Sequence, residues 1–123
     1  MAKRVLIVDD ALIIRKRIRE IAEQSGWEVV GEAANGEDAV ALYAEKKPDL
    51  VTLDIVMPKM DGVCALKRLM AADPKARVVM ISAVDQKTKL TECIQTGAID
   101  FIVKPFEKSK LRSFFDKYLA AEY

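Results

Sequence analysis

Side chains that could carry out chemistry stand at the ends of several apolar runs in this sequence. Asp9 and Asp10 follow one run, Asp54 follows another, and Ser82 and Lys104 close two more. Three carboxylates brought within a few ångströms of one another would repel unless a cation neutralised them. The sequence has no histidine, so a hard ion with oxygen ligands, such as Mg²⁺, is the natural candidate. An aspartate beside such an ion and an ammonium can attack a phosphoryl group, which indicates acyl-phosphate chemistry.

The apolar runs that precede these residues are typical of an α/β domain with a parallel sheet. Short stretches rich in Val, Ile and Leu alternate with longer segments of helical period, in five pairs. The predicted strands cover residues 4–8, 28–32, 50–53, 77–82 and 101–103, and two of the predicted helices span 63–72 and 87–96, the second ending at Gly97. Because ligands of open parallel sheets bind beyond the carboxyl ends of the strands, the polar residues are expected to converge there.

Size and composition restrict the possible functions. A chain of 123 residues fits one domain, and its formal charge of +1 lacks the basic excess typical of nucleic-acid binding. The apolar run at 5–8 is stopped by aspartates, so it is neither a signal peptide nor a membrane span. Cys64 and Cys93 are far apart among apolar neighbours, which predicts two buried thiols and a reducing, cytoplasmic location.

A basic run in the first predicted helix has an explanation that needs no ligand. Arg15, Lys16 and Arg17 are followed by Arg19, and the spacing predicts surface ion pairs from Lys16 to Glu20 and from Arg19 to Glu23. We therefore expect a solvated helix face rather than a nucleic-acid contact.

Each polar residue at a strand end also has a structural explanation when it is taken alone. Asp9 and Asp10 could cap a helix, Asp54 or Ser82 could begin a turn, and Lys104 could be a solvated lysine. Their joint placement at four strand ends favours a functional site.

The sequence resembles the receiver domain of two-component response regulators, and within that family the single-domain chemotaxis type. The resemblance covers nearly the whole chain, and the matching segments are residues 5–10 (VLIVDD), 54–62 (DIVMPKMDG), 81–83 (ISA), 97–98 (GA) and 101–106 (FIVKPF). It implies one receiver domain over residues 1–123 with a doubly wound, flavodoxin-like (βα)5 fold. The five-stranded parallel sheet would have the order 2-1-3-4-5, with helices on both faces.

The resemblance also implies a role for each site residue. Asp54 would be the phosphoacceptor, and Asp9, Asp10 and Asp54 would hold Mg²⁺ together with the backbone carbonyl of Val56. Ser82 would hydrogen-bond the attached phosphoryl group and Lys104 would pair with it, next to a cis peptide bond to Pro105. Movement of Ser82 would open space into which Phe101, the aromatic switch, turns.

Partners follow from the same resemblance. A sensor histidine kinase would supply the phosphoryl group, which fits a chain that has no histidine of its own. A downstream protein, such as the flagellar motor switch, would recognise the changed surface of the fourth helix, fifth strand and fifth helix. The protein would be a stand-alone monomer that catalyses only its own phosphorylation and slow dephosphorylation, and a separate phosphatase could end the signal.

Two valines predict that the acyl phosphate is lost slowly. Val56 lies two residues after Asp54 and Val84 two residues after Ser82, beside the route that a hydrolytic water would take. Polar side chains at these places could orient such a water, whereas valines cannot.

Other functions remain open from the sequence. Among regulators, the chain could be a phosphorelay carrier or the receiver of a transcriptional regulator. A flavodoxin-type electron carrier shares the fold, but Asp9 and Asp10 would repel a flavin phosphate. A Mg²⁺-dependent phosphatase with an aspartyl phosphate would commonly carry a second aspartate where Val56 stands.

Overall fold

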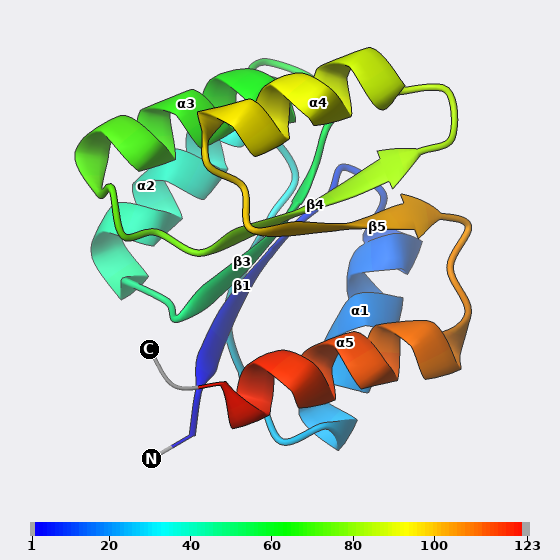
Figure 1. Ribbon diagram of the computed structural model, residues 1–123. Helices are drawn as coiled ribbons and strands as arrows, with labels where there is room; N and C mark the ends of the chain where they lie inside the picture. Colours follow the sequence, from blue (N-terminus) through cyan, green and yellow to red (C-terminus); the bar gives the residue numbers. More distant parts are fainter. Residues whose placement is uncertain (1, 122–123) are drawn as a thin grey trace.

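The computed structural model describes residues 2–121 and has the predicted alternation of strands and helices (Figure 1). The strands are β1 (Arg4–Val8), β2 (Glu28–Ala33), β3 (Leu50–Asp54), β4 (Val78–Ala83) and β5 (Asp100–Lys104). The helices are α1 (Leu12–Gln24), α2 (Gly36–Lys46), α3 (Gly62–Ala72), α4 (Lys87–Thr96) and α5 (Lys108–Ala120). The predicted limits differ from these by one residue at several ends.

All neighbouring strands pair in parallel, and the sheet has the order β2-β1-β3-β4-β5. This confirms the predicted doubly wound fold. The central strand β3 is buried along its whole length, as expected for a strand covered on both faces. The edge strand β2 is only partly buried, which agrees with its flanking charges.

Helices cover the two faces of the sheet with different cores (Figure 1). On one face α2, α3 and α4 pack aliphatic and small side chains, among them Leu53 and Leu66, against the sheet. On the other face α1 and α5 bury a cluster rich in aromatic residues, which includes Trp27 and Phe115. Helix α5 buries four side chains whereas α4 buries only Cys93, so α4 is the less firmly packed helix beside β5.

Local capping explains where several helices begin and end. The side chain of Asn35 accepts a hydrogen bond from the Asp38 amide at the start of α2, and Asp61 accepts one from the Cys64 amide at the start of α3. Gly97 ends α4 with φ of 130°, a backbone angle that favours glycine. Its predicted role as the C-terminal cap is confirmed.

Two sequence predictions about side chains are wrong in part. Cys93 is buried, but Cys64 lies on the exposed face of α3, because the helical period turns it away from the sheet. Arg19 pairs with Glu23 at 3.4 Å as predicted. Lys16 and Glu20, which both lie within the described chain, form no ion pair; instead, the basic side chains that cross to the sheet are Arg15 and Arg19, which both contact Glu32.

Within residues 2–121, none of the helices combines the length and the apolar character that a membrane span requires.

Candidate functional site

Four strands bring polar residues to one edge of the sheet, where their carboxyl ends meet. Asp9 and Asp10 directly follow β1, and Asp54 is the last residue of β3. Ser82 lies near the end of β4, and Lys104 is the last residue of β5. The predicted site residues of β1, β3 and β5 all lie at the carboxyl ends of their strands, and they are therefore also neighbours in space.

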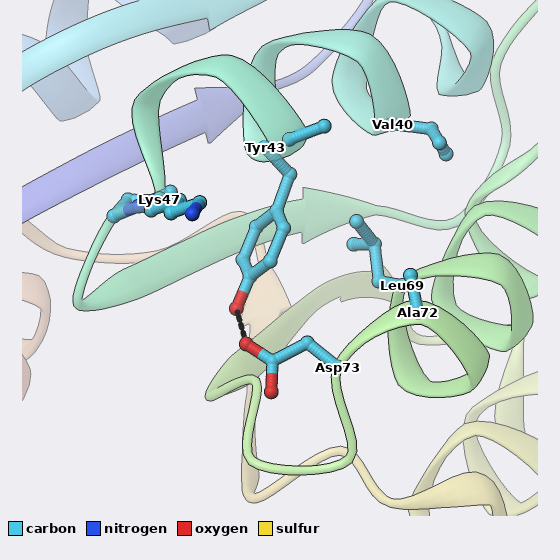
Figure 2. A pocket seen from close by; sticks show the side chains of 8 residues that line it. Val40, Tyr43, Lys47, Leu69, Ala72 and Asp73 are labelled. Carbon is cyan, nitrogen blue, oxygen red and sulfur yellow. Dashed lines mark hydrogen bonds between the residues drawn. The ribbon is translucent and has the colours of Figure 1, made fainter.

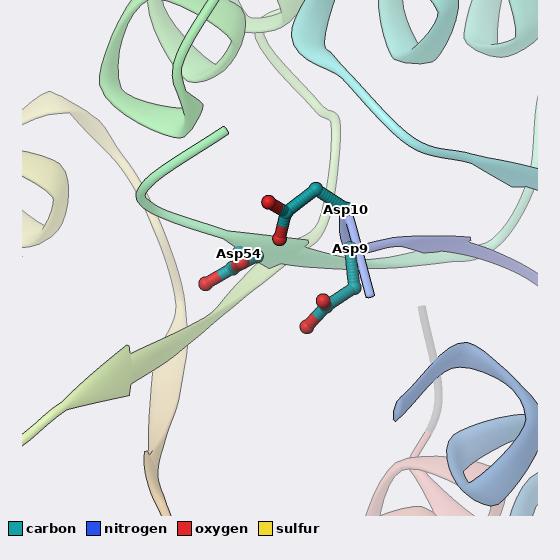
Figure 3. Close-up of side chains that lie close together, drawn as sticks. All are labelled: Asp9, Asp10 and Asp54. Carbon is teal, nitrogen blue, oxygen red and sulfur yellow. The ribbon is translucent and has the colours of Figure 1, made fainter. Parts of the chain in front are cut away.

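Three aspartates form a compact acidic cluster at this edge (Figure 3). One oxygen atom from each of Asp9, Asp10 and Asp54 lies within 4.8 Å of the others. Asp9 is fully buried and Asp54 nearly so, whereas Asp10 is exposed. The Asp9 carboxylate also accepts a hydrogen bond from the Ala11 amide at 2.9 Å, which fixes its orientation.

Lys104 contributes one positive charge to this cluster. Its Nζ atom lies 2.7 Å from Oδ2 of Asp9 and 3.4 Å from Oδ1 of Asp54. Burial opposes the charged form of Lys104, but the hydrogen bond to Asp9 and the charge of Asp54 outweigh it and raise the pKa of Lys104. The ammonium is therefore a fixed cation beside the Asp54 carboxylate.

One ammonium does not balance three carboxylates. Burial and then the charge of Asp9 raise the pKa of Asp54 to about 6, against the opposing effect of Lys104. The remaining negative charge, together with a donor set made only of oxygen atoms, fits a hard divalent cation. Asp9, Asp10 and Asp54 are the residues that could hold one.

Close packing fixes the loop that follows Asp54. A Cβ atom on Gly62 would lie 2.1 Å from the Asp54 carbonyl oxygen, so only glycine fits there. The Gly62 amide donates to the Ile55 carbonyl at 2.6 Å. Val56, by contrast, is 50% exposed, and Val84 is 68% exposed. The two valines that are predicted to slow hydrolysis are thus exposed, in loops at the edge of the site.

Ser82 and Phe101 lie on the paired strands β4 and β5. Ser82 is buried, and its hydroxyl donates to the Ala83 carbonyl at 3.2 Å. Phe101 is 45% exposed, so it is not a core aromatic residue. It lines a hollow of about 340 Å³ together with residues of α4, including Leu90 and Ile94. An exposed aromatic ring beside an open space on the loosely packed helix has room to move.

A larger hollow, of about 490 Å³, lies at the opposite end of the sheet between α2 and α3 (Figure 2). The Tyr43 hydroxyl donates to Oδ2 of Asp73 at 2.8 Å on its wall. Burial, and after it this hydrogen bond, raise the pKa of Tyr43. The acidic cluster lies far from this hollow along the strands, so volume alone does not identify the reactive site.

Sequence reasoning missed one side chain that contacts the acidic cluster. Arg15 of α1 donates from Nη1 to the Asp9 carbonyl oxygen at 2.7 Å. The sequence offered no signal for it, because an arginine in a charged helical segment has the pattern of a solvated surface residue.

Comparison with known proteins agrees with this geometry. The response regulator receiver domain family matches residues 5–116. The chain is 49% identical to the chemotaxis protein CheY of Thermotoga maritima, over 95% of this chain and 98% of that protein. It is 50% identical to CheY of Bacillus subtilis, over 97% and 99% respectively.

A solved structure supports the same family assignment. A chain in the crystal structure of the CheX-CheY-BeF3-Mg+2 complex from Borrelia burgdorferi superimposes with a TM-score of 0.89 at 39% identity, over 97% of this chain and 90% of that one. The chain described here therefore belongs to the response regulator receiver domain family.

Proposed function

We propose that this protein is a chemotaxis response regulator that accepts a phosphoryl group on Asp54 from a sensor histidine kinase. The observation that carries the proposal is the nearly buried Asp54 carboxylate, which faces the Lys104 ammonium at 3.4 Å and lies within 4.8 Å of oxygen atoms from Asp9 and Asp10. Similarity to CheY proteins over nearly the full chain supports the chemotaxis assignment.

The proposed reaction is a phosphoryl transfer between two side chains. A carboxylate oxygen of Asp54 attacks the phosphorus of a phosphohistidine on the kinase, and the bond from phosphorus to the imidazole nitrogen breaks. The electron pair of that bond stays on the imidazole. Lys104 offsets the charge of the oxygen atoms on the transferring group, which is the contribution of a preorganised cation in a largely buried site.

The acidic residues would hold Mg²⁺ during this reaction. Asp9, Asp10 and Asp54 would be its carboxylate ligands, and the backbone carbonyl of Val56 would be a further oxygen ligand. When bound, Mg²⁺ offsets negative charge on the phosphoryl oxygens. The close approach of Gly62 to the Asp54 carbonyl holds the start of the loop that carries Val56.

The proposed output is a changed protein-binding face. Ser82 leaves its bond to the Ala83 carbonyl and donates to the phosphoryl group, and Phe101 then turns into the space that this movement opens. The surface of α4, β5 and α5 changes with it, and a downstream protein such as the flagellar motor switch binds there. A separate phosphatase could end the signal. One structural neighbour comes from a complex of CheX with CheY, so a second protein binds that relative.

The protein mass after incubation with acetyl phosphate tests this proposal. With Mg²⁺, the wild-type chain should gain one phosphoryl group, whereas the Asp54→Ala variant should gain none. Omission of Mg²⁺ should greatly reduce the gain for the wild type. Equal labelling of both proteins would place the reaction at another residue.

A further inference from the structure

Arg15 links the loop after β1 to the edge strand β2. Its Nη1 atom donates to the Asp9 carbonyl oxygen at 2.7 Å, and its Nε atom donates to Oε1 of Glu32 at 3.1 Å. Only 15% of the Arg15 side chain is exposed. The guanidinium is thus held between an active-site backbone atom and a carboxylate of the sheet.

The Asp9 carbonyl belongs to the peptide unit that joins Asp9 to Asp10. Because a peptide unit is planar, a hydrogen bond that fixes its carbonyl also fixes the direction in which the chain enters Asp10. The Asp9 carboxylate has its own partners, the Ala11 amide and Lys104. The carboxylate of Asp10, in contrast, has no hydrogen bond or ion pair with any residue in the range 2–121, so its placement depends on the backbone.

Glu32 keeps the guanidinium in place. Its second oxygen, Oε2, accepts a hydrogen bond from Nε of Arg19 at 2.6 Å, and Arg19 also contacts Glu23. Glu32 is therefore held from both sides, and charge-assisted bonds of this kind are strong and directional. Arg19 shares the helix, the charge and the Glu32 contact of Arg15, but no contact joins it to Asp9.

We propose that Arg15 is a positioning residue: it holds the Asp9–Asp10 peptide so that the Asp10 carboxylate faces Asp9 and Asp54 and can bind Mg²⁺. This inference rests on the proposed function of the acidic cluster. For the loss of Arg15, it predicts a change in Mg²⁺ affinity opposite to the one that simple electrostatics predicts. Loss of a positive charge near three carboxylates should by itself tighten cation binding, whereas loss of the positioning contact should weaken it.

Titration calorimetry of Mg²⁺ binding to the unphosphorylated chain separates the two effects. We expect Arg15→Gln to weaken Mg²⁺ binding about tenfold, the lower end of the range for partners that orient metal ligands. Arg15→Lys keeps the charge but cannot bond Asp9 and Glu32 with one planar group, so it should also weaken binding. The matched control Arg19→Gln removes the same charge and loosens Glu32, but it keeps the bond from Arg15 to the Asp9 carbonyl, so it should weaken Mg²⁺ binding much less than Arg15→Gln does or not at all.

A double variant shows whether Arg15 acts through Asp10. In an Asp10→Asn background, Arg15→Gln should change the Mg²⁺ affinity much less than it does in the wild type. Urea unfolding confirms that each variant is folded, and if Arg15→Gln is not, Arg15→Lys carries the test. Binding by the Arg15 variants that equals or exceeds that of the wild type would overturn this inference and leave the proposed function intact. A wild-type protein that binds no Mg²⁺ would overturn both.

Discussion

The carboxyl and amino ends of the strands differ in what holds them together. At the carboxyl ends, Asp9 and Asp54 are withdrawn from water beside one lysine, and their charges do not balance. At the amino ends the charged groups have partners: Arg4 donates to the Lys46 carbonyl at 2.6 Å, and Lys117 lies 3.5 Å from the Asp100 carboxylate. The indole of Trp27 packs on Phe115 there and donates to its carbonyl at 3.0 Å. Figure 1 shows the start of β1 and the end of α5 at this second end.

This difference separates two tasks within one small fold. The amino ends and the aromatic core stabilise the folded chain, and the carboxyl ends hold charges that a cation or a phosphoryl group can rearrange. Residues at the carboxyl ends should therefore be less important for stability, or even reduce it, while residues of the aromatic core should be essential to it. The following substitutions test that contrast.

The largest effect is expected in the aromatic core. Phe115 is fully buried and its ring contacts those of Trp27 and Phe114. Phe115→Ala should lower the free energy of unfolding by about 3–5 kcal/mol, because it removes buried area and leaves a cavity. The control Phe101→Ala removes the same ring from a half-exposed position and should cost less than about 1 kcal/mol. Urea unfolding measures both, and similar losses would contradict the contrast.

A substitution at Asp54 should raise the free energy of unfolding, whereas Phe115→Ala lowers it. Burial and the charge of Asp9 raise the pKa of Asp54 from 3.8 to about 6, so the folded state binds its proton more tightly than the unfolded state does. The contribution of Asp54 to the free energy of unfolding is therefore fully present below pH 3.8 and is lost as the pH rises through about 6. Above that pH, Asp54→Asn should therefore stabilise the Mg²⁺-free protein by roughly 2–3 kcal/mol.

Urea unfolding at about pH 4 and about pH 8 checks this prediction. The gain from Asp54→Asn should be small at the lower pH and full at the higher one, and excess Mg²⁺ should reduce it by stabilising the wild type. A gain that is the same at both pH values would mean that the charge of Asp54 is not its cause.

Val56 tests whether the site edge controls the lifetime of the phosphoryl group. Val56→Asn adds a polar group that can orient a hydrolytic water. One hydrogen bond to this water would lower the activation free energy of hydrolysis by about 1 kcal/mol, which would shorten the phosphoryl half-life about fivefold. Val56→Ile keeps the position apolar and should leave the half-life unchanged. If both variants lose phosphate at the wild-type rate, water access at this position does not limit hydrolysis.

The smallest effect concerns Thr52, two residues before Asp54 on β3. Its hydroxyl is fully buried and has no hydrogen-bond partner among the described residues. Thr52→Val removes this unsatisfied group at nearly the same shape and should stabilise the protein by about 0.5–1 kcal/mol. The control Val51→Thr buries a new hydroxyl on the other face and should destabilise it. Destabilisation by Thr52→Val would show that the hydroxyl makes a favourable contact.

The sequence was most informative where chemistry coincides with strand ends. Asp9, Asp54 and Lys104 could be brought together in advance, because parallel strands share one carboxyl edge whatever their exact limits. The strand order and the identity of the family required the longer motifs around these residues. The α/β alternation alone gave the class of fold.

Side-chain direction on helices and loops could not be predicted in the same way. Cys64 has apolar neighbours in sequence, yet the helical period exposes it. The charged pattern of its segment predicts a solvated Arg15, and only the tertiary fold shows that its guanidinium reaches the Asp9 carbonyl. The half-exposed position of Phe101 also depends on how α4 packs beside β5.

Chemical trapping of the phosphorylated residue tests the central claim most directly. Borohydride reduces an aspartyl phosphate to homoserine, and fragmentation of the resulting peptides reads the modified position. After treatment with acetyl phosphate and Mg²⁺, homoserine should appear at position 54 alone. Homoserine at position 9 or 10, or none at all in a protein that has gained a phosphoryl group, would contradict the assignment of Asp54 as the acceptor.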